Sequence, residues 1–149
     1  MLLVRVAEPA QMIAELRPTL ESALGPAIQL ECELGAATTR VRVDPSHLRE
    51  MLLVMLANAR DAIRETGRAD GQVVIRTTQV YLPPGSEPDV PPGDYLTISV
   101  ADNGSGIAED DLERMFEPFQ QGAAGVRNGS GLGLSISRQF VELHDGQMW

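Results

Sequence analysis

The sequence predicts an α+β fold in which a mixed, mostly antiparallel sheet packs on helices as a two-layer sandwich. Short segments alternate apolar and polar residues, as half-buried strands do. Segments with helical spacing lie between them, but they are too few to cover both faces of a parallel sheet. A length of 149 residues, of which 43% are hydrophobic, suits one domain with a sizeable core. We therefore expect residues 1–149 to form a single domain.

The first 43 residues predict a lead-in of strands around one helix. Four elements are expected there: a short strand at Leu2–Val6, a helix from Pro9 to Gly25-Pro26, a half-buried strand at Ile28–Leu34 and a short strand at Arg40–Val43.

The strongest helix signal runs from Pro45 to Glu65. Asp44 can cap its start, and Pro45 suits the first helical position. Its apolar residues recur at helical spacing, which predicts one broad buried face: Leu48, Met51, Leu52, Met55, Ala59 and Ile63.

The second half continues with two neighbouring strands and further helices. The strands are expected at Val73–Leu82 and Tyr95–Val100, with a proline-rich loop at 83–94 between them. The remaining pattern predicts a short helix at Ala108–Met115, an irregular segment at 116–129 and a helix at Leu132–His144.

The composition excludes several classes of protein. Twelve Lys and Arg against 21 Asp and Glu give a net charge of −9, which disfavours non-specific binding to nucleic acid or anionic membranes. The one cysteine, Cys32, cannot form an internal disulfide and fits a reducing compartment. The start of the chain does not resemble a signal peptide, and no apolar run approaches the roughly 20 residues that span a bilayer. We expect a cytoplasmic domain, although a longer parent protein could be membrane-anchored.

Asn58 is the first candidate for ligand chemistry. It lies on a helical stripe with Val54, Asp61 and Glu65, beside the apolar face. A carboxamide offers an oxygen to a metal or ligand without adding charge. A partly exposed helix residue would look the same, so Asn58 alone does not decide the matter.

The second candidate is Asp102-Asn103-Gly104-Ser105-Gly106, directly after the predicted strand. Its glycines permit a tight turn and the close approach of backbone to a ligand, and Asp102 could accept a hydrogen bond from an amino group. An ordinary turn remains open as an alternative. An EF-hand does not fit, because Gly104 and Ile107 stand where that loop needs an oxygen ligand and a glycine.

The third candidate is Gly129-Ser130-Gly131-Leu132-Gly133-Leu134-Ser135, which leads into a predicted helix. Glycine-rich backbone before a helix presents N–H groups and a positive dipole end to phosphate. No strand directly precedes the segment, as a dinucleotide fold requires, and no Lys-Ser/Thr follows, as a P-loop requires. A flexible linker remains an equal alternative for this segment taken alone.

The order of the motifs is more specific than any one of them. Asn58 within Leu-Ala-Asn-Ala-Arg-Asp-Ala, then Asp-Asn-Gly-Ser-Gly-Ile, then Phe-Glu-Pro-Phe and then Gly-Ser-Gly-Leu-Gly-Leu-Ser resemble the N, G1, F and G2 boxes of sensor histidine kinases. The chain resembles their catalytic ATP-binding domain, in the superfamily of the Bergerat fold shared with gyrase B and MutL. The resemblance covers nearly the whole chain and implies an ATP-binding core at 44–149.

The resemblance implies a role for each box residue. Asn58 would hold Mg²⁺ against the phosphates of ATP, and Asp102 would bind the adenine amino group. The segment 116–129 would be the ATP lid, anchored by Phe116 and Phe119. The remaining site residues implied are the glycines near the base, Gly104 and Gly106; the apolar walls, Ala62, Ile107 and Leu132; the glycines near the phosphates, Gly129, Gly131 and Gly133; and, as weaker phosphate contacts, Arg60 and Arg127.

The resemblance also implies partners outside this chain. The phosphoryl group would pass from ATP to a histidine on a separate dimerisation domain of the same protein, and then to a response regulator. The family's acceptor is a histidine followed by an acidic residue on a dimerisation helix. His47 lies instead in the first turn of the long predicted helix and His144 near the end of the last one, so neither has that context. We expect no autophosphorylation of this chain alone and no contact with nucleic acid.

Three departures from the family weaken the kinase interpretation. Val54 stands where most members carry a second asparagine, and Asp61 stands where many carry a lysine that faces the phosphates. The last strands of the family are also absent, so we expect either a trimmed chain or a sheet that another chain completes, and we favour trimming. The alternatives are a catalytically impaired nucleotide-binding module that regulates partners, and an anti-sigma-factor type of serine kinase.

Overall fold

The protein is described by a computed structural model that places residues 3–35, 39–86 and 90–106. Its elements, in chain order, are β1 (Arg5–Ala7), α1 (Pro9–Leu24), β2 (Ile28–Leu34), β3 (Val41–Val43), α2 (Pro45–Thr66), β4 (Gly71–Leu82) and β5 (Gly93–Asp102). The predicted helices at 108–115 and 132–144 and the predicted lid at 116–129 lie outside the described residues.

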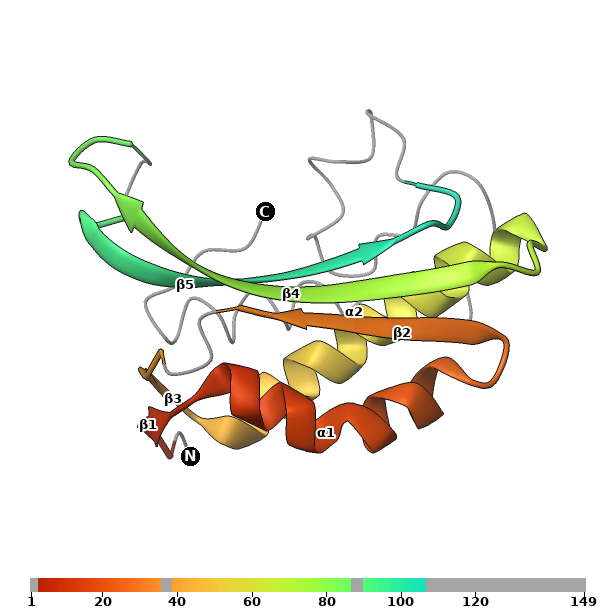
Figure 1. Ribbon diagram of the computed structural model, residues 1–149, viewed down its shortest axis with the longest axis horizontal. Coiled ribbons are helices and arrows are strands. Elements are labelled where there is room, and N and C mark those ends of the chain that lie inside the picture. Colours follow the sequence, from red (N-terminus) through yellow and green to blue (C-terminus); the bar gives the residue numbers. More distant parts are fainter. Residues whose placement is uncertain (1–2, 36–38, 87–89, 107–149) are drawn as a thin grey trace.

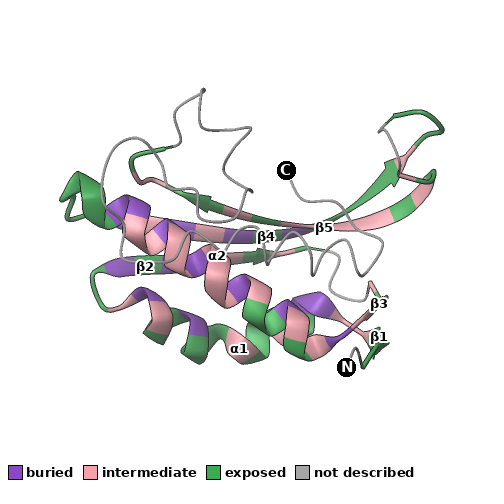
Figure 2. Ribbon diagram, turned by 180° about the vertical axis from the view of Figure 1, so that it is seen from behind, coloured by how far each residue is buried: buried purple, intermediate pink, exposed green. Residues whose placement is uncertain are grey.

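The main sheet has β4 in the middle, with β2 parallel to it on one side and β5 antiparallel on the other. Helices α1 and α2 lie together on one face of this sheet, which makes two layers (Figures 1 and 2). Strands β1 and β3 form a separate antiparallel pair near the start of α1. The predicted two-layer α+β sandwich with a mixed sheet is confirmed.

The core lies between the two helices and the covered face of the sheet. Alternation in β2 buries Ile28 and Leu30 and exposes Gln29, Glu31 and Glu33, as the sequence predicts. The fully or almost fully buried hydrophobic residues of the helices and of β4 are Ile13, Leu20, Leu24, Leu48, Leu52, Leu56, Ala59, Ile63, Val73 and Ile75.

The predicted apolar face of α2 was wrong in one respect. Leu56 is fully buried, although the sequence analysis leaves it off the buried face and places Met55 there instead. Met55 is only half-buried. The reason is that α1 and the sheet both contact α2, so its buried stripe is wider and rotated relative to the stripe expected from one packing partner.

Strand β5 continues further than its hydrophobic pattern predicts. It ends at Asp102, which pairs with Val73 of β4, whereas alternation alone placed the end at Val100. Backbone pairing with a longer neighbour extends a strand beyond its own apolar residues. Asp102 therefore sits on the end of the sheet, and its backbone position is fixed by β4.

Candidate functional site

Asn58 lies in the middle of α2, one helical turn before Ala62 and on the same face. Its side chain is half-buried, and its Nδ2 atom is inaccessible to solvent and has no hydrogen-bond partner among the residues that the structure describes. A buried polar group without a partner costs about 1–3 kcal/mol. The amide can also turn to present its oxygen, because rotation exchanges its two ends. A ligand at this position would remove that cost.

The loop that follows β5 packs directly on α2 at Ala62. A β-carbon built on Gly104 would lie 2.6 Å from the carbonyl carbon of Ala62 and 2.7 Å from the amide nitrogen of Ile63. The amide of Ser105 donates a hydrogen bond to the Ala62 carbonyl oxygen, at 3.0 Å. From the sequence, Gly104 is expected to lack a side chain so that a ligand can lie close to the backbone. The structure gives another reason, which is that helix and loop approach too closely for any side chain.

Asp102 is exposed at the end of β5. Its Oδ1 atom accepts a hydrogen bond from the amide of Gly104, at 2.8 Å, which holds the carboxylate over its own loop. Within the described part of the chain its second oxygen accepts no hydrogen bond. Gly106, also exposed, has φ +76°, a conformation that glycine adopts without strain. One carboxylate oxygen is thus fixed and the other is available to a donor such as an amino group.

Several residues without an assigned role in the sequence analysis anchor this loop. The side chain of Asn103 donates to the carbonyl oxygen of Asp70 at 2.9 Å and accepts from the amide of Gln72 at 2.8 Å. Arg68 donates to the Asn103 carbonyl oxygen at 2.6 Å. The turn between α2 and β4 therefore holds the loop at Asn103, while Ala62 holds it at Ser105. In the sequence, the positive charge of Arg68 in that turn is the signal that could have indicated its contact with Asn103.

Arg68 and Asp70 form an ion pair through two hydrogen bonds, at 2.7 and 3.0 Å. The Arg68 guanidinium lowers the pKa of the Asp70 carboxyl, and the hydrogen bond to that carboxyl raises the pKa of Arg68. On the other side of the loop, the Ser105 hydroxyl donates to the Glu65 carboxylate at 3.0 Å. The loop is thus held by polar contacts at both of its sides.

The structure shows where three further residues near Asn58 lie, namely Arg60, Asp61 and Val54. Arg60 donates to the carbonyl oxygen of Ala23 at 3.1 Å and pairs with Asp61 at 3.3 Å, so it ties α2 to the end of α1. Val54 is half-buried on α2, one turn before Asn58. Arg60 thus already has two partners within the protein.

The other predicted site residues lie outside the described residues: Ile107, Phe116, Phe119, Arg127, Gly129, Gly131, Leu132, Gly133 and His144. His47 lies half-buried in the first turn of α2. Among the described residues, no group of three or more His, Cys, Asp or Glu side chains could hold a metal ion. A metal at Asn58 would therefore need ligands from its substrate, as Mg²⁺ commonly has from phosphates.

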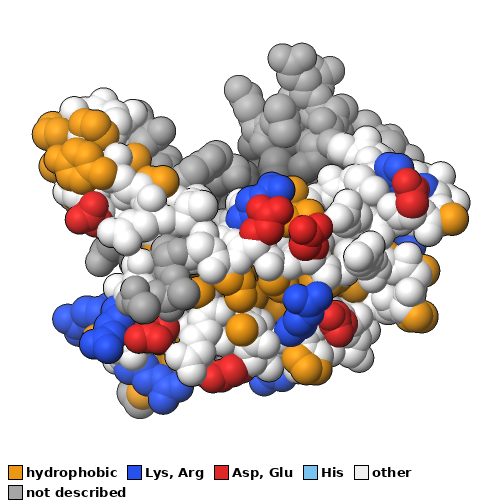
Figure 3. All heavy atoms as spheres, viewed as in Figure 1, with side chains coloured by type: hydrophobic (Ala, Val, Ile, Leu, Met, Phe, Trp, Pro, Cys, Tyr) orange, Lys and Arg blue, Asp and Glu red, His pale blue; other side chains and the backbone are white. Residues whose placement is uncertain are grey.

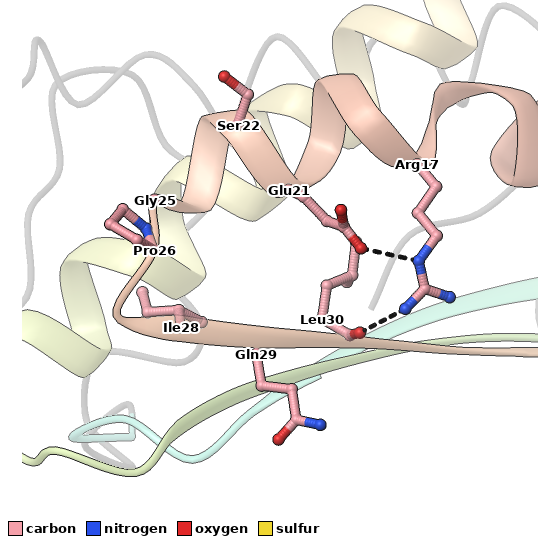
Figure 4. A pocket seen from close by; sticks show the side chains of 8 residues that line it. All are labelled: Arg17, Glu21, Ser22, Gly25, Pro26, Ile28, Gln29 and Leu30. Carbon is pink, nitrogen blue, oxygen red and sulfur yellow. Dashed lines mark hydrogen bonds and ion pairs between the residues drawn. The ribbon is translucent and has the colours of Figure 1, made fainter.

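Two shallow hollows lie near the turn between α1 and β2. One, of about 470 Å³, is crossed by Arg17, which donates to Glu21 at 2.8 Å and to the Leu30 carbonyl oxygen at 3.0 Å (Figure 4). The other, of about 510 Å³, has Asn103 and Gln72 among its walls. Neither hollow is lined by Asn58 or Asp102.

The free end of the β4–β5 hairpin carries exposed hydrophobic side chains, among them Val80 and Tyr81 (Figure 3). In the strand register, Val80 pairs with Tyr95, while Asp102 pairs with Val73 near the other end of β4. The hairpin end therefore lies at the opposite end of the sheet from the loop at 102–106.

Comparison with known proteins decides the family. Residues 43–149 match the family described as histidine kinase-, DNA gyrase B-, and HSP90-like ATPase. The chain belongs to this ATPase family. Two of its relatives are the sensor kinase CckA of Brucella abortus, 33% identical over 144 residues and 95% of this chain, and the sensor protein PfeS of Pseudomonas aeruginosa, 36% identical over 129 residues and 87% of this chain. This ATPase domain is of the kind found in sensor histidine kinases.

Solved structures support the same fold for this ATPase domain. The mycobacterial sensor histidine kinase MprB matches with a TM-score of 0.71 at 25% identity, over 94% of this chain and 81% of the MprB chain. The catalytic domain of histidine kinase ThkA matches with a TM-score of 0.64 over 95% of this chain and 82% of its own. In contrast, the chain spans only 15% of the CckA relative and 25% of the PfeS relative. In the residues that the structure covers, no helix is long and apolar enough to cross a membrane.

Proposed function

We propose that this chain binds Mg²⁺-ATP and donates the γ-phosphoryl group to a histidine on a separate dimerisation domain of the same protein, from which a response regulator takes it. The observation that carries the proposal is the contact between the Asn58–Ala62 face of α2 and the loop at 102–106. Through the hydrogen bond between Ser105 and Ala62, the loop that carries the exposed, oriented Asp102 carboxylate packs on α2 one helical turn from Asn58, whose Nδ2 has no partner in the described residues.

In this proposal Asp102 selects the base. Its free carboxylate oxygen accepts a hydrogen bond from the exocyclic amino group of adenine, a donor that guanine lacks at the corresponding ring position. Ala62, whose exposed fraction is 8%, gives the pocket an apolar wall on α2, and Gly104 keeps the loop against that wall. Gly106 turns the chain with its positive φ. Ile107 and Leu132 complete the apolar walls.

Asn58 serves the phosphate end of the nucleotide. Mg²⁺, when bound, neutralises phosphate charge and so favours phosphoryl transfer. Asn58 fits Mg²⁺-ATP because its side-chain oxygen is a neutral ligand for the cation, and its Nδ2, which has no partner among the described residues, can donate to a phosphate oxygen. Gly129, Gly131 and Gly133 offer backbone N–H groups to the phosphates. The segment at 116–129 acts as the lid over the nucleotide.

The protein has little covalent work in such a transfer. Its contribution is to position the nucleotide and to stabilise phosphate charge, while the acceptor imidazole comes from another domain. Val54 can act neither as a metal ligand nor as a general base, so hydrolysis of ATP by this chain is expected to be slow. The kinase role is favoured over a purely regulatory one because the chain keeps Asn58 and both glycine-rich motifs, and a scaffold has no need of a phosphate site.

A nucleotide titration with and without Mg²⁺ tests this proposal. We expect ATP to bind, Mg²⁺ to strengthen binding, and Asp102→Asn to weaken it, because the Gly104 N–H would hold the single amide oxygen and leave an NH₂ donor facing the amino group of adenine. Adding a histidine-bearing dimerisation domain should then yield a phosphohistidine, whereas the chain alone should yield none. Failure of ATP to bind at millimolar concentration would overturn the proposal, and binding without transfer would favour the regulatory alternative.

A further inference from the structure

Asn103 joins the loop after β5 to Arg68, Asp70 and Gln72 through hydrogen bonds. Four of its polar groups have partners. Its amide donates to the Gln72 carbonyl oxygen at 3.2 Å, and its carbonyl oxygen accepts from Arg68 at 2.6 Å. Its side-chain oxygen accepts from the Gln72 amide at 2.8 Å, and its side-chain nitrogen donates to the Asp70 carbonyl oxygen at 2.9 Å. These contacts join the loop to the start of β4.

The residue type at this position follows from the chemistry of the contacts. The side chain must accept from one backbone amide and donate to one backbone carbonyl, and a carboxamide does both. Aspartate would lack the donor, and an aliphatic residue would leave the Gln72 amide without its side-chain partner. Arg68 completes the arrangement, because its guanidinium bonds to the Asp70 carboxylate and to the Asn103 carbonyl oxygen at the same time.

The backbone of Asp102 is paired with β4, but its carboxylate has no comparable set of partners. Its carboxylate accepts a hydrogen bond only from Gly104 among the described residues, and that bond lies within the same loop. The orientation of the carboxylate therefore depends on where the backbone at 103 and 104 is held. Ala62 holds this backbone from the α2 side, and Asn103 holds it from the β4 side.

We propose that Asn103, fixed by Arg68 and Asp70, is a positioning residue that sets the orientation of the Asp102 carboxylate and thereby the preference of the site for adenine over guanine. This inference rests on the proposed function, in which Asp102 binds the base. Asn103 itself does not contact the nucleotide. Its effect is transmitted through one peptide unit, so a change at Asn103 alters base selection more than it alters binding of the phosphates.

The test measures affinity for Mg²⁺-ATP and for Mg²⁺-GTP by calorimetric titration of the 149-residue chain. We expect Asn103→Ala to weaken ATP binding about tenfold and to leave GTP binding nearly unchanged, so that the ATP-to-GTP preference falls by a similar factor. A loss of structure alone would weaken both nucleotides together. Arg68→Gln, which leaves every backbone hydrogen bond of Asn103 to β4 in place, should reduce the preference in the same direction but by less.

Gln72→Ala is the matched control. The Gln72 backbone bonds to Asn103, but its side chain bonds to Glu31 instead, so this variant removes a neighbouring side-chain contact and leaves the Asn103 contacts intact. Its ATP-to-GTP preference should equal that of the unmodified chain. If Asn103→Ala also keeps that preference within twofold, the positioning role is wrong.

Asp102→Asn separates this failure from failure of the proposed function. If Asp102→Asn loses the preference for ATP while Asn103→Ala and Arg68→Gln keep it, the nucleotide site stands and the role of Asn103 is wrong. If Asp102→Asn also leaves both affinities unchanged, the assignment of the base site is itself wrong. Should Asn103→Ala fail to fold, Arg68→Gln decides the matter. A reduced ATP-to-GTP preference would then support the positioning role, and an unchanged preference would contradict it.

Discussion

Two asparagines of the candidate site differ in one respect that separates their roles. Asn103, after β5, has partners for its backbone amide, its backbone carbonyl and both ends of its side chain. Asn58, in the middle of α2, has a buried side-chain nitrogen that finds no partner within the described ranges. Evolution of a stable fold alone would remove an unpartnered buried amide, because it costs free energy. The comparison shows that the contacts of Asn103 stabilise the loop, and it supports the proposal that Asn58 serves a ligand.

The largest effect is expected at the contact between the loop and α2. Gly104→Ala places a methyl group 2.6 Å from backbone of α2, which cannot move aside as a flexible side chain can. We expect a loss of about 3 kcal/mol or more in the free energy of unfolding, measured by urea denaturation. Gly85→Ala is the control, because Gly85 has φ +76° and, apart from its chain neighbours, no atom of the described residues lies within 4 Å of a built β-carbon, so this variant reports backbone strain alone. Equal losses for both variants would contradict the close approach.

Asn58→Ala tests directly whether the Asn58 amide serves a ligand or the fold. We expect ATP affinity in the presence of Mg²⁺ to fall at least tenfold, while the unfolding temperature stays the same or rises, since an unpartnered amide is removed. Calorimetric titration and thermal unfolding measure the two properties. Glu50→Ala, at an exposed position of the same helix, is the control and should change neither. A clear fall in stability for Asn58→Ala would show that its amide has a structural role after all.

Val54→Asn sharpens the comparison by adding a second amide one turn before Asn58. We expect Mg²⁺-dependent ATP binding to tighten by about threefold to tenfold, because amide oxygens are suitable ligands for Mg²⁺. Binding without Mg²⁺ should change little. Val54→Ala, which shortens the side chain without adding an oxygen, serves as the control. Calorimetry that finds the same affinity for Val54→Asn and Val54→Ala would contradict the placement of this helix face.

The smallest effect is predicted for Asp44, whose carboxylate, like the side chain of Asn103, has hydrogen-bond partners. Hydrogen bonds from the Leu3 amide at 2.7 Å and the Ser46 amide at 2.9 Å favour its ionised form and lower its pKa. Because the folded-state pKa lies below the unfolded one, this contribution to stability is complete above the unfolded pKa of about 4 and is lost as the pH falls through the folded value.

We expect Asp44→Asn, which can still cap α2, to lower the midpoint of thermal unfolding at pH 7 by a few degrees. Its difference from the unmodified chain should shrink as the pH falls below about 4. Thermal unfolding followed across pH measures both effects. A difference that persists unchanged at pH 2 would contradict the lowered pKa.

The order of elements and much of the core follow from local patterns. Alternation places β2 at Ile28–Leu34, and Asp44-Pro45 and Gly67 mark the ends of α2. These signals are local because strand alternation, helix capping and a left-handed glycine each depend on a few neighbouring residues. The burial of Leu56 and the end of β5 at Asp102 were missed, because each depends on a second element packed or paired against it.

The sequence by itself determined the family and the identity of the motif residues Asn58, Asp102 and Gly104, since motif order is a property of the chain. Only the tertiary structure decided what those residues contact. Gly104 meets α2, Asn103 meets the start of β4, and the side-chain nitrogen of Asn58 meets no hydrogen-bond partner in the described part of the chain. Contacts between residues 30 or more positions apart are set by how helices and strands pack together, and no short stretch of sequence specifies that packing.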